Sequence, residues 1–207
     1  HHCPFFNPGA MPDAHGVDPA ELTQPSDQHR AIGSPGGPDE TKSLCADYRR
    51  LGLRLIMDPG QQIPMFTGPE LINMLDGPFM PICNEYESEL FKKTRAQSTE
   101  DLLQHTQMII VTKGDNGSEL LAPGRGSQHI RLVPARQAAT PTGAGDAFRA
   151  GLMKGLSMGD HLVTACRLGA TVAAFCVEAE GTQDQQFTLN EVAARYAAAF
   201  KEQISLG

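Results

Sequence analysis

The sequence predicts an α/β fold with a mostly parallel central sheet and helices on both of its faces. From Pro38 onward, helical patterns alternate with short apolar runs, and polar residues follow these runs at their carboxyl ends. Strands that are covered on both faces read as continuous apolar runs, because neither face meets water. Ligands bind beyond the carboxyl ends of the strands in such sheets, so the polar residues there are the candidates for a functional site.

The first 38 residues differ in composition from the rest. Seven of the 15 prolines fall between Pro4 and Pro38, and several glycines lie among them. Proline interrupts both helices and central strands. We therefore predict a loop-rich segment at 1–38 that can carry one short strand, followed by the α/β region at 39–207.

The first helix and strand follow from a start signal, a stop signal and an apolar run. Pro38 stands before two acidic residues, which is typical of a first helical turn, and Gly52 is placed to end the helix. The run 53–57 is mostly apolar and ends at Asp58, as a buried strand would.

The same alternation continues through the middle of the chain. Pro69 opens a second helix, and 79–83 is the second buried strand. A third helix is expected from Glu85, and Ser98 with Asp101 forms a capping box that starts a fourth.

The next segment predicts a strand and then a pair of edge strands. The run 108–112 is apolar until its end, and the turn 114–117 leads into 118–121. Alternation at 128–133 predicts an antiparallel partner for that strand.

Three helices close the predicted fold. Two of them, rich in Ala and Leu, are expected at 143–157 and 159–178. The last begins at Thr188, where Glu191 completes a capping box before an amphipathic pattern.

Composition excludes several classes of partner. The net charge is −7, and the 17 Lys and Arg residues are scattered, so nucleic acid and anionic membrane surfaces are not expected partners. No run approaches the ~20 apolar residues of a membrane span. Five cysteines without C-x-x-C spacing predict reduced thiols in a cytoplasmic protein and no metal constellation. An oligomer stays possible.

The stretch from Thr140 to Phe148 holds the most informative chemistry. Gly143 and Gly145 lie in a turn that opens a helix, so backbone N–H groups can face a negative group there. Asp146 lies in the first helical turn, where the helix dipole favours negative charge, and it could accept a proton from a hydroxyl that attacks phosphorus. The alternative is that Asp146 only caps the helix and the glycines only make the turn.

The run from Pro141 to Phe148 closely resembles the C-terminal signature of the PfkB carbohydrate and nucleoside kinase family. The resemblance implies a ribokinase-like three-layer fold, an anion hole made by the amides of Gly143, Ala144 and Gly145, and Asp146 as the catalytic base. The form Gly-Asp-Ala-Phe-Arg is similar to bacterial adenosine kinase-like members and makes Arg149 a candidate phosphate contact. A solvent-facing Arg149 is the alternative.

Two further motifs resemble the family in the expected order. Asn84 and Glu87 match an Asn-x-x-Glu motif whose Glu organises Mg²⁺ and phosphate through water, which implies no direct protein ligand for the metal. Thr112, Gly114 and Gly117 match a Thr-x-Gly-x-x-Gly loop beside ATP. The alternatives are a helix-capping Asn84 with Glu87 at the surface, and an ordinary hairpin turn.

The resemblance implies an ATP- and Mg²⁺-dependent phosphotransferase that acts on a small molecule, with 39–207 as the nucleotide-binding part. Similarity to adenosine kinase-like members favours the 5′-hydroxyl of a nucleoside such as adenosine. A sugar kinase of the ribose or fructose type is the alternative within the family. A catalytically impaired nucleotide-binding fragment is the alternative of another class.

Two departures from the family pattern carry expectations of their own. Thr140 stands where the family usually has an acidic residue that helps hold a monovalent cation, which argues against potassium activation. The family domain also begins well before the position that matches His1. The first strands and the lid are therefore expected to be absent, and the chain alone is expected to turn over little substrate.

Overall fold

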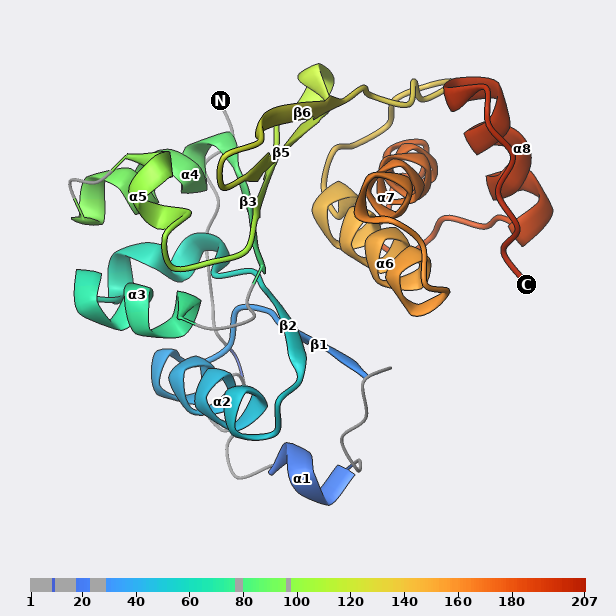
Figure 1. Ribbon diagram of the computed structural model, residues 1–207. Helices are drawn as coiled ribbons and strands as arrows, with labels where there is room; N and C mark the ends of the chain where they lie inside the picture. Colours follow the sequence, from blue (N-terminus) through green and yellow to red (C-terminus); the bar gives the residue numbers. More distant parts are fainter. Residues whose placement is uncertain (1–8, 10–17, 23–28, 77–79, 96–97) are drawn as a thin grey trace. The chain divides into compact units, whose positions relative to one another are not determined.

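The computed structural model describes residues 9, 18–22, 29–76, 80–95 and 98–207 (Figure 1). The chain divides into two compact units. Unit 1 holds residues 1–110 and 122–124, and unit 2 holds residues 111–121 and 125–207.

The strands among the described residues follow one another across a single sheet in the order of the sequence. They are β1 (Arg30–Gly33), β2 (Arg54–Met57), β3 (Met80–Asn84), β4 (Ile109–Thr112), β5 (Ser118–Ala122) and β6 (Gly126–Ile130). β1 pairs with β2 and β2 with β3 in parallel. β5 and β6 are joined by three residues, which only an antiparallel pair permits. The predicted α/β class with a mostly parallel sheet is confirmed.

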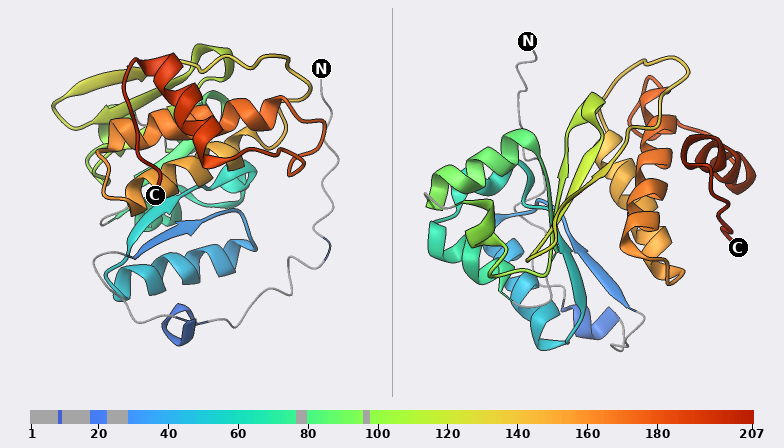
Figure 2. Two further views of the ribbon diagram at one scale, coloured as in Figure 1. Left: turned by 90° about the vertical axis from the view of Figure 1, so that its right-hand side faces the viewer. Right: turned by 45° about the horizontal axis from the view of Figure 1, so that its top comes forward.

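The helices of unit 1 are α1 (Pro19–Leu22), α2 (Pro38–Arg50), α3 (Gly68–Leu75), α4 (Glu85–Arg95) and α5 (Thr99–Leu102), with the 3-10 helix η2 (Gly60–Met65) after β2. Helices α2 to α5 lie on one side of β1 to β3 (Figures 1 and 2). The predicted start of α2 at Pro38 is confirmed, and Gly52 follows its end with φ +66°. Such a left-handed residue is the usual stop for a helix.

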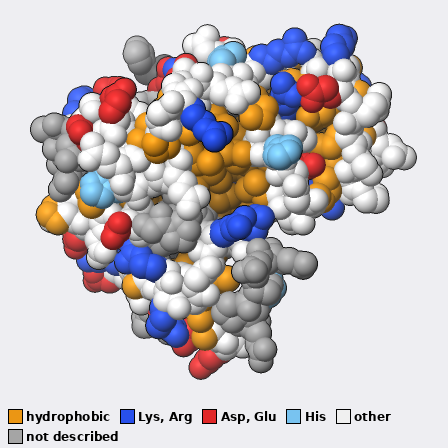
Figure 3. Space-filling model, in the orientation of Figure 1, with side chains coloured by type: hydrophobic (Ala, Val, Ile, Leu, Met, Phe, Trp, Pro, Cys, Tyr) orange, Lys and Arg blue, Asp and Glu red, His pale blue; other side chains and the backbone are white. Residues whose placement is uncertain are grey.

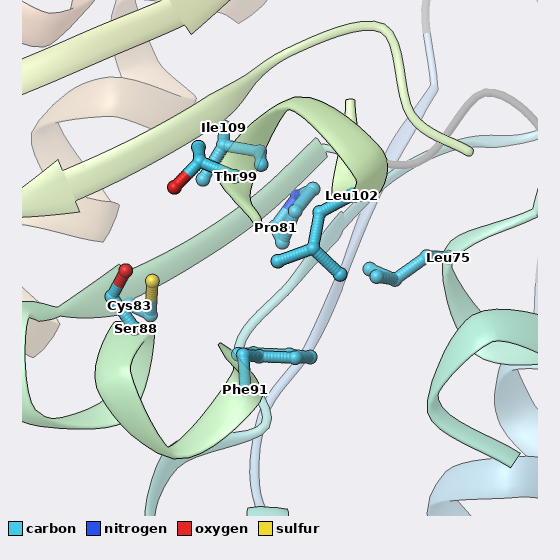
Figure 4. Close-up of a pocket in the computed structure, with 8 residues that line it drawn as sticks. All are labelled: Leu75, Pro81, Cys83, Ser88, Phe91, Thr99, Leu102 and Ile109. Atoms are coloured by element: carbon cyan, nitrogen blue, oxygen red, sulfur yellow. The ribbon is translucent and has the colours of Figure 1, made fainter. Parts of the chain in front are cut away.

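The core of unit 1 lies between these helices and the strands. Leu55, Ile56 and Met57 of β2 are at most 2% exposed, as expected for a strand covered on both faces. A cavity of about 10 Å³, roughly the space of one water molecule, remains beneath α4 and α5 (Figure 4). Its mostly apolar lining includes Leu75, Phe91 and Leu102. The cavity is therefore a packing void of the core and too small for a substrate.

Unit 2 contains α6 (Ala144–Ser157), α7 (Leu162–Val177) and α8 (Leu189–Phe200). Helices α6 and α7 pack closely because small residues face each other. A Cβ on Gly151 would lie 2.8 Å from Cα of Gly169, and a Cβ on Gly155 would lie 2.8 Å from Cα of Ala165. On the other side of α7, Leu168 packs with Val192 of α8. The backbone approach at α6 and α7 depends on the missing side chains.

Replacing Gly151 by Ala is expected to lower the free energy of unfolding by about 1–3 kcal/mol, because the added methyl group meets backbone atoms of α7 that cannot rotate away. Thermal denaturation followed by circular dichroism measures the change. Gly145→Ala on the same helix is the control, since its new Cβ has an ordinary contact at 3.6 Å. The prediction is wrong if both variants melt together.

Two elements differ in their boundaries from the prediction for local reasons. The helix expected at 159–178 begins only at Leu162, because Gly159 has φ +82° and the amide of Asp160 bonds to the carbonyl of Gly155, which closes the end of α6. The strand expected at 128–133 occupies Gly126–Ile130, because positive φ at Gly124 and Gly126 completes the turn early.

The capping pattern at the start of α3 was missed. Thr67 and Glu70 form a capping box that starts the helix at Gly68, one residue before the expected start at Pro69, and the side chain of Thr67 accepts from the amide of Glu70. The described residues of the segment 1–38 include β1, a short strand of the kind expected there, and α1, which the sequence did not predict.

None of the helices described is both long and apolar enough to cross a bilayer. On the face shown in Figure 3, Lys and Arg side chains lie in separate groups among acidic and uncharged residues.

Candidate active site

The turn before α6 requires glycine at its centre. Gly143 is the N-cap of α6 and has φ +86°, a left-handed conformation that side chains rarely adopt. A Cβ there would lie 3.1 Å from the Thr182 carbonyl oxygen and 3.2 Å from Sγ of Cys176. Backbone geometry and lack of space therefore both select Gly143.

Three amides of this turn have no acceptor within the part of the chain that the structure describes. They belong to Gly143, Gly145 and Asp146, at the positions where the first N–H groups of a helix have no carbonyl to bond. The helix dipole adds to their positive potential. The arrangement can hold an anion.

The amide of Ala144 does not belong to this set. It donates to the carbonyl oxygen of Pro141 at 3.2 Å and so closes the turn. The resemblance predicted that Ala144 faces a phosphate, but in this geometry its N–H is already engaged. The amide of Asp146, in contrast, has no acceptor among the described residues.

Asp146 and Arg149 form an ion pair on the first turn of α6. The Asp146 side chain is 78% exposed, whereas that of Arg149 is 18% exposed. The N-cap residue is Gly143, with no side-chain cap hydrogen bond, so Asp146 does not cap the helix. The guanidinium of Arg149 bonds to the carboxylate of Asp146, and its low exposure disfavours the alternative of a solvent-facing Arg149.

Cys176 of α7 contacts the backbone of the turn. Its Sγ lies 3.8 Å from the carbonyl oxygens of Thr142 and Thr182, within reach of weak S–H hydrogen bonds. Burial and, secondarily, the negative charge of Asp146 raise the pKa of the thiol, which keeps it protonated. The sequence offered no motif for this contact, because Cys176 lies 34 residues from Thr142.

The loop that leads into the turn is anchored to the end of α7. The amides of Ala139 and Thr140 both reach the carbonyl of Val177. The carboxylate of Glu178 accepts from the amide of Arg136 and pairs with Arg195 at 3.0 Å. Sequence reasoning missed these contacts also.

Glu178 is expected to make the stability of unit 2 sensitive to acid. Burial opposes its ionisation, but hydrogen bonds from Arg195 and the Arg136 amide outweigh burial and hold the pKa below its usual 4.5. The stabilisation is complete above pH 4.5 and is lost as the pH falls through the lower, folded-state pKa. Glu178→Gln should remove about 1–2 kcal/mol at pH 7 and flatten this acid loss.

Urea unfolding between pH 3 and pH 7 measures the effect of Glu178→Gln. Glu180→Gln is the matched control. It removes one carboxylate from the same segment, but Glu180 is exposed. Equal pH profiles for the two variants would contradict the role of Glu178.

In unit 1, Asn84 and Glu87 cap α4 reciprocally. The side chain of Asn84 accepts from the amide of Glu87, and Oε2 of Glu87 accepts from the amide of Asn84, both at 2.9 Å. The cap alternative is therefore observed for Asn84, but Glu87 is buried rather than at the surface. Its Oε1 accepts no hydrogen bond from the described residues and stays available for a bound water.

The loop at the carboxyl end of β4 is a tight turn that closes on itself. The 3-10 helix η3 (Gly114–Asn116) forms within it, and the amide of Lys113 bonds to the carbonyl of Gly117 at 2.7 Å. Gly117 has φ +77°, and its missing Cβ would lie 2.2 Å from the carbonyl oxygen of Ile130. This glycine is therefore required by the approach of the following strand.

A larger hollow in unit 2 lies away from the turn at Gly143. It has a volume of about 560 Å³ and is lined by residues from the carboxyl end of α6, such as Lys154 and Met158, and by the chain end from Glu202 to Gly207. A helix of 14 residues is about 21 Å long, so the hollow and the turn at Gly143 lie at opposite ends of α6.

Known proteins are similar to this chain over most of its length. The family described as pfkB family carbohydrate kinase matches residues 45–188. The nucleoside kinases of Methanocaldococcus jannaschii and Methanothermobacter thermautotrophicus are both 30% identical, over 84% and 82% of this chain. The chain spans 58% and 54% of those two proteins, a little over half of each.

Solved structures agree with the predicted ribokinase-like fold. The nucleoside kinase of Burkholderia thailandensis in complex with inosine matches with a TM-score of 0.81 and 29% identity, over 86% of this chain and 60% of that one. The nucleoside kinase of Methanocaldococcus jannaschii, an archaeal member of the ribokinase family, matches with a TM-score of 0.79 and 24% identity, over 92% of this chain and 61% of that one. The predicted fold family is confirmed.

Proposed function

Because this chain belongs to the pfkB family of carbohydrate kinases, we propose that it supplies the nucleotide-binding part of an ATP-dependent nucleoside kinase. The observation that carries the proposal is the turn before α6, where three unbonded amides stand beside the exposed carboxylate of Asp146. Amides aimed at a phosphoryl group stabilise the charge that develops on it during transfer.

Asp146 is the proposed catalytic base. The O–H bond of the acceptor hydroxyl breaks as its oxygen bonds to the γ-phosphorus, and the proton passes to the carboxylate of Asp146. The bond between the γ-phosphorus and the bridging oxygen breaks, and ADP leaves. The amides of Gly143, Gly145 and Asp146 lie at the turn where the transferring group would be held.

The residues at the end of β3 fit a magnesium ion that is held mainly by phosphates and water. In the part of the chain that the structure describes, no three His, Cys, Asp or Glu side chains gather as a metal site. Mg²⁺ commonly keeps several waters and uses few protein ligands. We assign Glu87 the role of orienting such a water through Oε1, with Asn84 fixing the carboxylate. The ion supplies charge neutralisation of the phosphates.

The loop after β4, Thr140 and the cysteines each support one further assignment. Thr112, Gly114 and Gly117 are assigned to the phosphate and ribose side of ATP, because their turn follows the carboxyl end of a strand. Potassium has no part in the proposal, since Thr140 offers a hydroxyl bonded to Thr142 at 3.3 Å instead of a carboxylate. Free, buried cysteines support a cytoplasmic location.

A nucleoside is favoured as the acceptor because relatives of this chain are nucleoside kinases and one solved relative holds inosine. A coupled assay of ADP release with ATP and Mg²⁺ tests it, using adenosine, inosine, ribose and fructose as acceptors. Preference for a nucleoside supports the proposal, and preference for a sugar supports the sugar-kinase alternative. ATP binding without turnover of any acceptor would identify a catalytically impaired fragment.

A further inference from the structure

The guanidinium of Arg149 lies between two possible partners of opposite kinds. On one side it bonds to the carboxylate of Asp146. On the other side it lies beside Gly145, where the position of a Cβ would be 3.6 Å from Nη1 of Arg149. The amides of Gly145 and Asp146 have no protein acceptor among the described residues. An anion bound by these amides would therefore lie close to the guanidinium.

The ion pair with Asp146 is easily opened. The Asp146 side chain is 78% exposed, and exposed ion pairs contribute little because water screens them. A phosphate carries more charge than a carboxylate and can accept two parallel hydrogen bonds from a guanidinium. Arg149 is only 18% exposed, and its Nη1 already lies beside Gly145, next to the amides that have no protein acceptor among the described residues.

We propose that Arg149 is a positioning residue that holds the carboxylate of Asp146 in the absence of nucleotide and exchanges to the phosphates when ATP binds. The inference rests on the proposed function. The exchange frees Oδ1 of Asp146 to accept the proton of the acceptor hydroxyl only when a phosphoryl donor is in place. It also leaves a positive charge between the base and the phosphates, which would otherwise repel each other.

Nucleotide binding to the 207-residue chain tests the exchange without requiring turnover. Isothermal titration calorimetry compares ATP with AMP, which lacks the β- and γ-phosphates. Arg149→Met is expected to weaken ATP binding about 10- to 100-fold, the range for a hydrogen bond to a charged group, and to leave AMP binding unchanged. Arg149→Lys should lose less, because it keeps the charge but not the fork of donors.

A double-mutant cycle then distinguishes the exchange of Arg149 from simple repulsion between the Asp146 carboxylate and the phosphates of ATP. Asp146→Asn is expected to tighten ATP binding by about 2- to 5-fold, because it removes the competing partner of Arg149. In the Arg149→Met background this gain should shrink, since no guanidinium remains to be released. Repulsion alone would give an equal or larger gain in that background, which would overturn the proposal.

Arg167→Met is the matched control, because Arg167 on α7 also pairs with an exposed carboxylate, that of Glu202 at 2.7 Å. Its ATP affinity should equal that of the unmodified chain. Equal weakening of ATP and AMP binding by Arg149→Met would show a structural role and overturn the exchange, and melting curves of Arg149→Lys check the fold. Failure of the unmodified chain to bind ATP would overturn the proposed function itself.

Discussion

Asp146→Asn is expected to lower the rate of phosphoryl transfer by roughly 10²- to 10⁴-fold, the range contributed by a general base. The change keeps the size of the side chain and the first turn of α6 but removes the oxygen that accepts the proton. Since the amides of Gly143 and Gly145 are unchanged, ATP affinity should move only a few-fold. Steady-state rates of ADP release and a separate nucleotide titration measure the two effects.

Asp39→Asn is the matched control for this variant. Asp39 also lies in the first turn of a helix, is 98% exposed and pairs with a basic residue three positions later, Lys42. Its loss changes the net charge equally but should leave the rate unaltered. A rate that survives Asp146→Asn would remove the base from the mechanism, whatever the amides of the turn bind.

Elements with strong local signals were predicted well. The start of α2 at Pro38, the capping box of Ser98 with Asp101 and that of Thr188 with Glu191 all lie where expected. Each depends on residues within one turn of each other. The start of α7 was predicted three residues early. The amide of Asp160 donates to the carbonyl of Gly155 and so ends α6, and a backbone hydrogen bond of this kind has no side-chain pattern in the sequence.

In the candidate site, too, local features could be predicted from the sequence and contacts between distant segments could not. Gly143 and Asp146 could be selected from the sequence because a glycine turn and a carboxylate at a helix start form a pattern suited to holding a phosphate. The pairing of Arg149 with Asp146 was not predicted, although their spacing of three residues allows it. Contacts from Cys176 and Glu178 could not be predicted, since they join segments that only the folded chain brings together.

Glycine in the loop after β4 illustrates how a family motif and a steric need coincide. Gly117 was selected from its resemblance to an ATP-binding loop, yet the structure gives it a reason that needs no ligand. Its Cβ would overlap the backbone of Ile130 and lie 2.9 Å from the amide nitrogen of Leu132. Gly114, in the same loop, has φ +51° but open space around it. Substitutions at the two glycines therefore distinguish the cost of conformational strain alone, at Gly114, from strain combined with steric overlap, at Gly117.

Gly117→Ala is expected to lower the free energy of unfolding by about 3 kcal/mol or more, because positive φ and overlap with rigid backbone act together. Gly114→Ala should cost only about 1 kcal/mol, the strain of a left-handed Ala alone. Chemical denaturation of both variants measures the difference. Equal losses would mean that β6 moves aside at Ile130, and nucleotide binding by Gly117→Ala would then report on the motif without the steric effect.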